Sequence, residues 1–460
     1  SFLVERLRRI FPDLVVQEEG AGLFRLAAPR PALEQAGTNP QVRRVLKEMP
    51  GWQEQGERLE RSEHWERGSL SRQSVDRLYG RRVPMSASRM DKYKSCHFSY
   101  FMRYGLRAEP RRSAGFDAPE YGTFVHYVLE HVLRDGGWKD KTGGVDRVKL
   151  KELTRQAVER YVREELGGLE HQTARFRYLF RRLLDGVDQV VDNVVQELAA
   201  SRFEPVAFEL GFGRNQDLPP VELEQDGVTV SVTGFVDRVD GWLHEDKLYL
   251  RVVDYKTGSK SFDLTEVQNG MGLQMLLYLF TLRQKGEELY GREIVPAGVL
   301  YLPARDVTVS GRRSMSEEER RKLLDKQLRR KGLVLDDPEV LSAMEQPGEE
   351  GIRFLPVKMN KSGALSGDGL VSARRFARLE RHVDRVLRDI CRELAAGNIA
   401  ADPFWRGPDK NACRYCDYAA ACHFEEGRGG DCRRWLSGVS AEEFWQSIEA
   451  QPEQTDKEGI

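Results

Sequence analysis

One segment of the chain, GFVDRVDGWLHEDKLYLRVVDYKTG at 234–258, carries two aspartates that a β-hairpin would bring together. If the turn falls between His244 and Lys247, Asp237 lies directly opposite Asp254 on the neighbouring strand. Directly opposed residues have Cβ atoms about 4.5–5.5 Å apart. Two carboxylates that close repel each other unless a cation lies between them. Hard oxygen ligands favour Mg²⁺ or Mn²⁺, so the segment predicts a divalent metal site.

A lysine completes this pattern. Lys256 follows Asp254 by two residues, so both side chains share one strand face while Tyr255 points to the other. A lysine beside a metal can orient a water molecule or stabilise the charge on a phosphate under attack, which is the chemistry of phosphodiester hydrolysis. A lone D-x-K is more often a surface salt bridge, but the second aspartate in register favours the catalytic interpretation. Asp240, opposite Arg251 on the other face, is interpreted as structural.

Three further side chains are candidates for this site. His126 lies on a predicted helix over 119–135. Alone it would more often be a packing histidine, as we expect for His131, but beside the carboxylates it becomes a suitable imidazole ligand. Gln274 and Tyr278, at i and i+4, share a face of the helix after the lysine strand. Contact with the DNA backbone and ordinary packing are equally good interpretations of that pair.

The cysteines form a second pattern. Cys413, Cys416 and Cys422 have C-x₂-C-x₅-C spacing, which indicates a metal site rather than disulfides in a chain without a secretion signal. Spacing alone leaves a zinc knuckle and an iron–sulfur cluster open. Cys391 falls on the apolar face of a helix and is expected to be a buried hydrophobic residue. The possible fourth ligands are Cys96, Cys391, Cys432 and His423.

Composition limits the class of protein. The 460 residues include 72 Lys and Arg against 73 Asp and Glu, which excludes a uniformly basic nucleic-acid coat but allows a local basic groove. The length permits about three domains. No apolar run is long enough for a transmembrane helix, and no signal-peptide pattern opens the chain, so we expect a cytoplasmic protein without membrane contact. The chain begins at Ser1, as a piece of a longer protein would.

Periodicity predicts an α+β fold with a mixed sheet. Residues 1–82 are charged, broken by Pro and Gly, and predicted to be a linker or packing segment. Helices are expected over 41–48, 54–67, 86–105, 119–135, 146–165, 172–200, 264–285, 315–331 and 372–397. Strands are expected over 205–212, 221–224, 228–241, 247–255 and 294–303, with a hairpin turn at Asp226-Gly227.

The chain resembles the C-terminal nuclease region of the B subunit of bacterial AddAB helicase-nucleases, among the RecB-like PD-(D/E)XK nucleases. The resemblance covers roughly residues 78–425, and its motifs occur in the family's order. They are LYG (78–80), SASRMDKYKSCHFSYFMRYGL, YGTFVH, GFVDRVD, VVDYKTG, LQMLLYL and the final C-x₂-C-x₅-C. It implies a restriction-endonuclease-like mixed sheet flanked by helices, with a nuclease domain over 83–425, a C-terminal tail over 426–460, and residues 1–82 leading from a helicase-like region.

The resemblance also assigns roles to residues. It implies that His126, Asp237, Asp254 and the Tyr255 carbonyl bind Mg²⁺ or Mn²⁺. Lys256 would be catalytic, supported by Gln274 and Tyr278. It further implies a [4Fe-4S] cluster that joins the N- and C-terminal segments through Cys96, Cys413, Cys416 and Cys422. The family usually has proline after its first cluster cysteine, where this chain has His97, and the role of Glu209 stays open.

The implied function is a Mg²⁺-dependent exodeoxyribonuclease that processes double-strand-break ends for recombinational repair. Its partners would be single-stranded DNA ends and the A subunit of the helicase-nuclease, and hydrolysis would use a metal-activated water. A stand-alone Cas4-like exonuclease is the alternative within the enzyme class, and a degenerate DNA-binding scaffold the alternative outside it. A basic stretch at Arg175, Arg177, Arg181 and Arg182 is a candidate DNA contact, although a solvated helix face is as good an interpretation.

Overall fold

The chain is described by a computed structural model that covers residues 2–13, 26–63, 65–110, 118–140, 143–168, 170, 173–258, 262–305, 307, 315–348, 351–360 and 363–451. It divides into two compact units. Unit 1 comprises Ser1–Arg67 and Glu425–Asp431, and unit 2 comprises Gly68–Phe424 and Cys432–Ile460. Within the described ranges, no helix combines the length and the apolar character needed to cross a lipid bilayer.

Unit 1 is a small helical unit with α1 (Phe2–Ile10), α2 (Pro29–Thr38), α3 (Pro40–Glu48) and α4 (Gln53–Glu63). Asn39 caps α3 by accepting hydrogen bonds from the backbone of Gln41 and Val42. A small apolar cluster of Ala32, Ala36 and Leu46, with Leu59 packed against it, holds α2, α3 and α4 together. Arg67 ties the returning loop to this unit through a buried ion pair with Asp431, 2.6 Å long.

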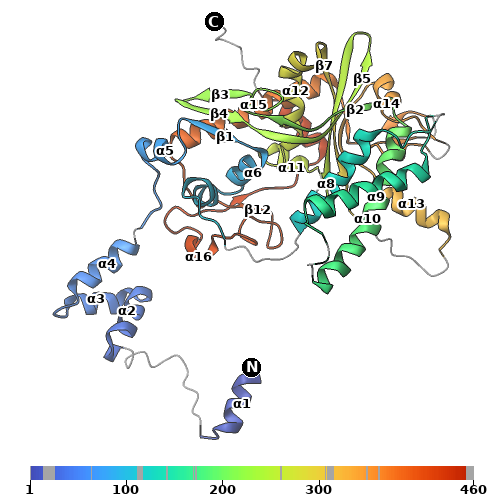
Figure 1. Cartoon of the computed structure of the whole chain (residues 1–460). Helices are drawn as coiled ribbons and strands as arrows, with labels where there is room; N and C mark the ends of the chain where they lie inside the picture. The colour runs from blue at the N-terminus through green and yellow to red at the C-terminus, as the bar shows by residue number, and fades with distance from the viewer. Residues whose placement is uncertain are drawn as a thin grey trace. The chain divides into compact units, whose positions relative to one another are not determined.

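Unit 2 is built on a mixed six-stranded sheet in the order β11-β8-β7-β6-β5-β2 (Figure 1). β5 pairs antiparallel with β2 and β6, β6 pairs parallel with β7, and β7 pairs antiparallel with β8. The sheet matches the mixed α/β core that the sequence predicts. Its strands are β2 (Glu204–Phe212), β5 (Gly234–His244), β6 (Lys247–Lys256), β7 (Glu293–Pro303), β8 (Lys331–Leu335) and β11 (Leu370–Val371).

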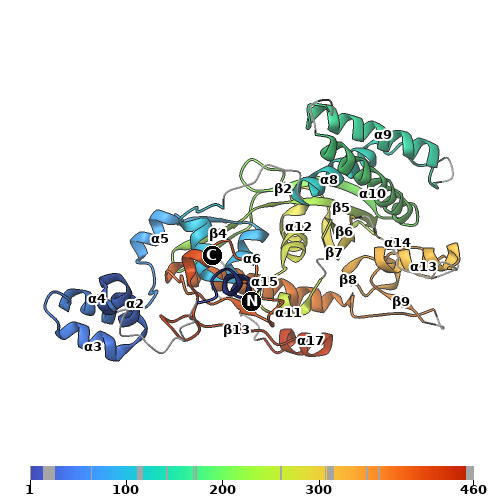
Figure 2. The same ribbon diagram turned by 90° about the horizontal axis from the view of Figure 1, so that it is seen from below.

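Helices flank this sheet, with α8, α9 and α10 gathered together and α12 beside β5 to β7 (Figure 2). The long helix α10 contributes Val187, Val191 and Val194 to the core, and α12 is buried along most of its length. The bounds of the flanking helices are α8 (Ala118–Asp135), α9 (Arg147–Glu164), α10 (Ala174–Ala199), α11 (Leu264–Gln268), α12 (Gln274–Tyr290), α13 (Glu317–Leu328), α14 (Pro338–Met344), α15 (Ala373–Ala395) and α17 (Ala441–Glu449).

A second sheet, in the order β1-β4-β3, consists of β1 (Arg82–Met85), β3 (Glu222–Gln225) and β4 (Val228–Val232). The turn between β3 and β4 has positive φ at Asp226 and Gly227, as expected for a two-residue hairpin. The remaining elements are α5 (Arg72–Leu78), α6 (Ala87–Ser95), α7 (His97–Tyr100), a π-helical turn (Phe101–Gly105), α16 (Ala419–Cys422) and the short strands β9 (Lys358–Met359), β10 (Leu365–Ser366), β12 (Phe404–Trp405) and β13 (Arg434–Trp435).

Three predicted elements are wrong in their continuity. The strand predicted over 228–241 is two strands in different sheets, with the break before Gly234. A Cβ built on Gly234 would lie 2.3 Å from the Tyr278 hydroxyl, so close packing against α12 explains this glycine. The helix predicted over 86–105 breaks at Cys96, which is extended. The helix predicted over 264–285 is α11 and α12, separated by Gly270 and Gly272, which both have positive φ.

Candidate active site

The β5–β6 hairpin has the register that the sequence predicts. Its ladder runs from His244 opposite Lys247 to Arg238 opposite Val253. The two loop residues adopt positive φ, which a tight hairpin requires. Asp237 and Asp254 are the next residues beyond the last pair of the ladder. Both therefore lie at the end of the sheet where β6 has its C-terminus, called the catalytic edge below.

Asp237 and His126 meet at this edge. The Asp237 carboxylate accepts the backbone N–H of Tyr255 at 2.7 Å, and its other oxygen lies 3.7 Å from His126 Nδ1. The second ring nitrogen of His126 lies 3.2 Å from the Tyr255 carbonyl oxygen. Helix α8 thereby places the His126 imidazole beside the Asp237 carboxylate and the Tyr255 carbonyl, as the resemblance implies. His131, one turn later, bonds the Tyr127 carbonyl of its own helix instead.

A third acidic residue belongs to this group. Glu209 Oε1 lies 3.9 Å from His126 Nδ1, and ligand atoms of His126, Glu209 and Asp237 all lie within 4.8 Å of one another. On β2, the neighbours of Glu209 pair with the neighbours of Asp237, and Glu209 itself has a φ of 48°. A strand residue other than glycine rarely adopts that conformation. The motif around Glu209 is weak in the sequence, so its role stayed open there, and a strand pattern does not reveal such a local backbone change.

The negative charges of this group repel one another, and the pKa values of Asp237 and His126 are shifted as a result. Burial and the nearby charge of Asp254 raise the pKa of Asp237 to about 7. Burial opposes protonation of His126, but the nearby carboxylates of Glu209 and Asp237 outweigh it and raise the histidine pKa to about 9. Protons therefore compensate the carboxylates here, and a divalent cation would fill the same role. The donor set of one imidazole and carboxylate oxygens fits such an ion.

Lys256 and Asp254 form the second half of the site. Lys256 Nζ lies 2.5 Å from Asp254 Oδ2 and donates to Gln274 Oε1 at 3.3 Å. Gln274 is the first residue of α12, so the lysine joins the helix to the sheet. Tyr278 lies one turn further, buried against Gly234 and stacked on Phe212. Its position supports packing of α12 on the strands, whereas Gln274 contacts the site directly.

A buried charge cluster lies on the opposite face of the same strands. Arg251 Nε bonds Asp240 at 2.9 Å, which confirms the structural pair that the register predicts. Arg238 bonds the same carboxylate at 2.8 Å, and Arg330 bonds Glu197 of α10 at 2.7 Å. All five of these side chains are at most 1% exposed. Arg238, which follows Asp237, belongs to this cluster and also donates to the hydroxyl of Tyr255, which follows Asp254. The cluster thus holds both strands in place from the face opposite the site.

The four cysteines singled out by the resemblance line one pocket of about 370 Å³. Cys96 lies at the break between α6 and α7. Cys413 and Cys416 lie in the loop before α16, and Cys422 is the last residue of α16. Burial raises the pKa of Cys96 to about 12, so a cation is needed to hold it as a thiolate. Four cysteines lining one pocket fit a four-cysteine metal or cluster site. These residues are Cys96, Cys413, Cys416 and Cys422.

The other cysteines have different settings. Cys391 is buried on α15, as predicted, and Cys432 is exposed and absent from the lining of the cysteine pocket. All six cysteines fall within the described ranges, and none of them forms a disulfide. Beside the pocket, His97 bonds Asp402 at 2.7 Å and Glu393 at 3.1 Å. His97 thus fixes the start of α7 by ion pairing, at the position where the resemblance leads one to expect proline.

The arginine stretch on α10 is only partly described. Arg177 and Arg181 are exposed, and the side chains of Arg175 and Arg182 lie outside the described part of the chain. Exposure suits both a DNA contact and a solvated helix face, so this prediction stays a prediction.

The chain is similar to known proteins. The B subunit of an ATP-dependent helicase/deoxyribonuclease from Clostridium novyi is 32% identical over 390 residues, which are 84% of this chain and 34% of the relative. Proteins of the same name from Acetivibrio thermocellus and Clostridium tetani are 33% and 28% identical, over 84% and 97% of this chain and 34% and 41% of theirs. The chain therefore spans about a third to two-fifths of the length of these curated relatives.

The family model for the PD-(D/E)XK nuclease superfamily matches residues 84–423, which contain the acidic site, its lysine and the cysteine pocket. This match covers most of the chain and nearly all of the large sheet-containing unit. The chain belongs to the PD-(D/E)XK nuclease superfamily.

Proposed function

We propose that this chain is a metal-dependent deoxyribonuclease that hydrolyses phosphodiester bonds. The observation that supports it most directly is the convergence of His126, Glu209 and Asp237 beside the Asp254–Lys256 pair at one edge of the sheet. One imidazole and three carboxylates supply an ion site, and the lysine supplies a positioned positive charge for a phosphate. A degenerate DNA-binding scaffold would not need this complete set.

Each side chain has a defined task in this proposal. His126, Asp237 and Asp254 hold Mg²⁺ or Mn²⁺ with the Tyr255 carbonyl. The bound metal supplies a Lewis acid that lowers the pKa of water and neutralises phosphate charge. Lys256 is held by Asp254 and Gln274, so its ammonium is positioned to orient the nucleophile and to stabilise charge on the phosphate. The Tyr255 N–H holds Asp237 in place, since it donates to that carboxylate.

We add Glu209 to the ligand set, which gives a testable result. Glu209→Gln should weaken Mn²⁺ affinity by roughly 10-fold to 100-fold, in the range seen when supporting groups of metal sites are removed. The measurement is isothermal titration with Mn²⁺. Glu222→Gln, on the smaller sheet, is the matched control and should bind Mn²⁺ like the wild type. Equal affinity in the Glu209 variant would remove this residue from the site.

We further propose that the cysteine pocket holds a [4Fe-4S] cluster through Cys96, Cys413, Cys416 and Cys422, joining the first and last parts of the nuclease domain over 83–425. The four cysteines line one pocket, which supports a shared site, and the family resemblance favours iron over zinc. The protein purified without oxygen should be brown and absorb near 400 nm.

Serine replacements test the ligand assignment. Cys413→Ser should remove most of the 400 nm absorbance and the bound iron, because one of four ligands is lost. Cys432→Ser should leave both unchanged, because Cys432 lies outside the pocket. A colourless wild-type protein that contains zinc would contradict the iron–sulfur assignment.

The relatives' name extends the proposal to the complete protein. We propose that this nuclease works in a helicase-nuclease, as an exonuclease on single-stranded DNA ends during break repair in the bacterial cytoplasm, with the A subunit as partner. The decisive test is simple. The 460-residue chain should degrade end-labelled single-stranded DNA with Mg²⁺ and stop with EDTA. An iron-loaded, folded chain that leaves this DNA intact with either Mg²⁺ or Mn²⁺ would refute the nuclease assignment.

A further inference from the structure

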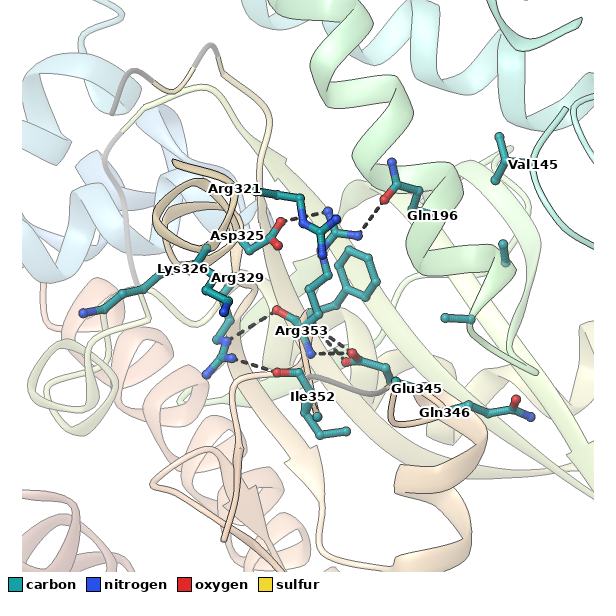
Figure 3. Close-up of a pocket in the computed structure, with 16 residues that line it drawn as sticks. Val145, Gln196, Arg321, Asp325, Lys326, Arg329, Glu345, Gln346, Ile352 and Arg353 are labelled. Carbon is teal, nitrogen blue, oxygen red and sulfur yellow. Dashed lines mark hydrogen bonds and ion pairs between the residues drawn. The ribbon is translucent and has the colours of Figure 1, made fainter. Parts of the chain in front are cut away.

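A basic pocket of about 880 Å³ lies in the large unit, between the C-terminal end of α10 and helix α13 (Figure 3). Five cationic and two acidic side chains line it. The cations are Arg321, Lys322, Lys326, Arg329 and Arg353, and the acids are Asp325 and Glu345. With all of them ionised, the lining carries a net charge of +3.

The two acids are engaged inside the wall. Glu345 is 3% exposed and accepts the backbone N–H groups of Arg353, Phe354 and Leu355 at 2.6–3.2 Å. Asp325 lies 2.8 Å from Arg353, whose guanidinium also donates to Gln196 of α10 at 2.6 Å. Figure 3 shows Arg353 between these partners. These contacts form the inner wall of the pocket. The other cations of the lining, called the outer cations below, are Arg321, Lys322, Lys326 and Arg329.

The outer cations differ in the contacts that hold them. Arg329 donates to the carbonyls of Ile352, Arg353 and Val357, and within the described ranges no carboxylate pairs with it. Lys326 is exposed and has no acidic partner in the described part of the chain. Helix α13 buries only Leu328, so its charged face contributes little to folding. Such a face is suited to binding an anion.

The pocket lies near the catalytic edge of the sheet. Asp254 on β6 pairs with Tyr301 on β7, and Tyr301 pairs with Lys331 on β8. Neighbouring strands are about 4.8 Å apart, so the backbone of Lys331 lies about 10 Å from that of Asp254. Arg329 precedes Lys331 by two residues. At about 3.3 Å per residue, the backbone of Arg329 therefore lies within roughly 17 Å of that of Asp254. The pocket is lined by α10 on the face of the sheet opposite the Asp254 side chain, so a strand bound at both places passes around the end of the sheet.

We propose that this pocket binds the sugar–phosphate backbone of the single DNA strand whose scissile bond lies at Asp254. Lys322 and Lys326 lie at i and i+4 on one face of α13, and Arg321 lines the same pocket from the adjoining face, so the helix presents a row of cations rather than one focal charge. Lys322 also pairs with Glu318 at 2.7 Å on the exposed helix surface, a contact worth little in water that a phosphate can replace. A row suits successive phosphates of a chain better than one small anion. The inference rests on the proposed nuclease function, and binding can be measured separately from cleavage.

The test reverses the exposed charges. Arg321→Glu, Lys322→Glu and Lys326→Glu are combined, and single-stranded oligonucleotide binding is followed by fluorescence anisotropy in EDTA over a range of salt. Each lost phosphate contact lowers the slope of log K against log salt by about 0.7, so three should lower it by about 2 and weaken binding on the order of 100-fold at 0.1 M salt. The thermal midpoint should stay unchanged, because all three side chains are exposed.

A matched triple variant separates the pocket from net charge. Lys149→Glu, Lys151→Glu and Arg160→Glu place the same charge change on exposed positions of α9 and should leave binding and slope close to wild type. Equal weakening by both triples, or wild-type binding by the α13 triple, would overturn the inference. A third outcome would favour a free phosphate ligand and also overturn the inference. In that outcome, millimolar pyrophosphate competes with the oligonucleotide on the wild type but not on the α13 triple variant, and the triple variant still binds the oligonucleotide. Wild-type cleavage, read in parallel, tests the proposed function independently.

Discussion

Asp254→Asn is expected to lower the rate of single-stranded DNA cleavage by about 10³-fold or more. The asparagine keeps the size of the side chain but removes a negative charge from the ion site and from Lys256, whose ammonium lies 2.5 Å away. The loss should appear in kcat more than in KM, because the carboxylate acts on the reacting phosphate rather than on the length of the strand. Initial rates with a saturating 5′-labelled oligonucleotide and Mg²⁺ measure it.

Lys256→Ala should have an effect of similar size, and the double variant should be little worse than either single one, since residues that act as a unit are strongly non-additive. Asp246→Asn, in the exposed loop of the same hairpin, is the control and should keep wild-type rates. Cleavage within tenfold of wild type in the Asp254 variant would move the catalytic centre elsewhere. Anisotropy in EDTA should show that the variant still binds DNA.

The second large effect concerns stability. Glu197→Ala should lower the free energy of unfolding by about 3–5 kcal/mol, because removing one partner of a buried ion pair leaves charge uncompensated. Glu197 is 1% exposed and lies 2.7 Å from Arg330, with Arg238 and Arg251 at 3.7 and 3.6 Å. Glu293→Ala, which breaks an exposed pair with Lys247, should cost less than about 1 kcal/mol. Urea unfolding followed by circular dichroism compares them.

The same carboxylate predicts a pH dependence. Burial opposes ionisation of Glu197, but the three arginines outweigh it and lower its pKa to about 2. A carboxyl with a lowered pKa stabilises the fold fully above its ordinary pKa of about 4.5 and progressively less as the pH falls to 2. The difference in unfolding free energy between wild type and Glu197→Ala should therefore shrink over that interval. A constant difference would show that lost packing, not charge, causes the destabilisation.

The sequence was most informative where local chemistry determines geometry. Glu245 and Asp246 favour a tight hairpin, and that turn sets the register that brings Asp237 and Asp254 to one edge. The spacing of Asp240 and Arg251 then follows, because alternate residues face opposite layers. His126 needed more than periodicity, since nothing in a helix pattern says which sheet edge it reaches, and the family resemblance supplied that link.

Other features depended on contacts between distant segments. Glu209 enters the site through a positive φ inside a strand, which no spacing rule anticipates. The helix from Ser86 is interrupted at Cys96 because the chain there bonds to Asp402 and Ala400, about 300 residues later. The charge cluster around Glu197 likewise joins α10, β5, β6 and Arg330. Only its Asp240–Arg251 pair follows from the hairpin register, and nothing in the sequence connects Glu197 or Arg330 to that pair.

The bond between His97 and Asp402 spans 305 residues, which has a consequence for biosynthesis. At about 5–20 residues per second, a ribosome takes roughly 15–60 s to make the intervening chain. During that interval, the segment around Cys96 has been made but lacks the partners that bury it, so its thiol is accessible to oxidants and to other chains. Completion of this part of the fold therefore waits until Asp402 has been made, and anything that shortens the wait or shields Cys96 should raise the yield of folded protein.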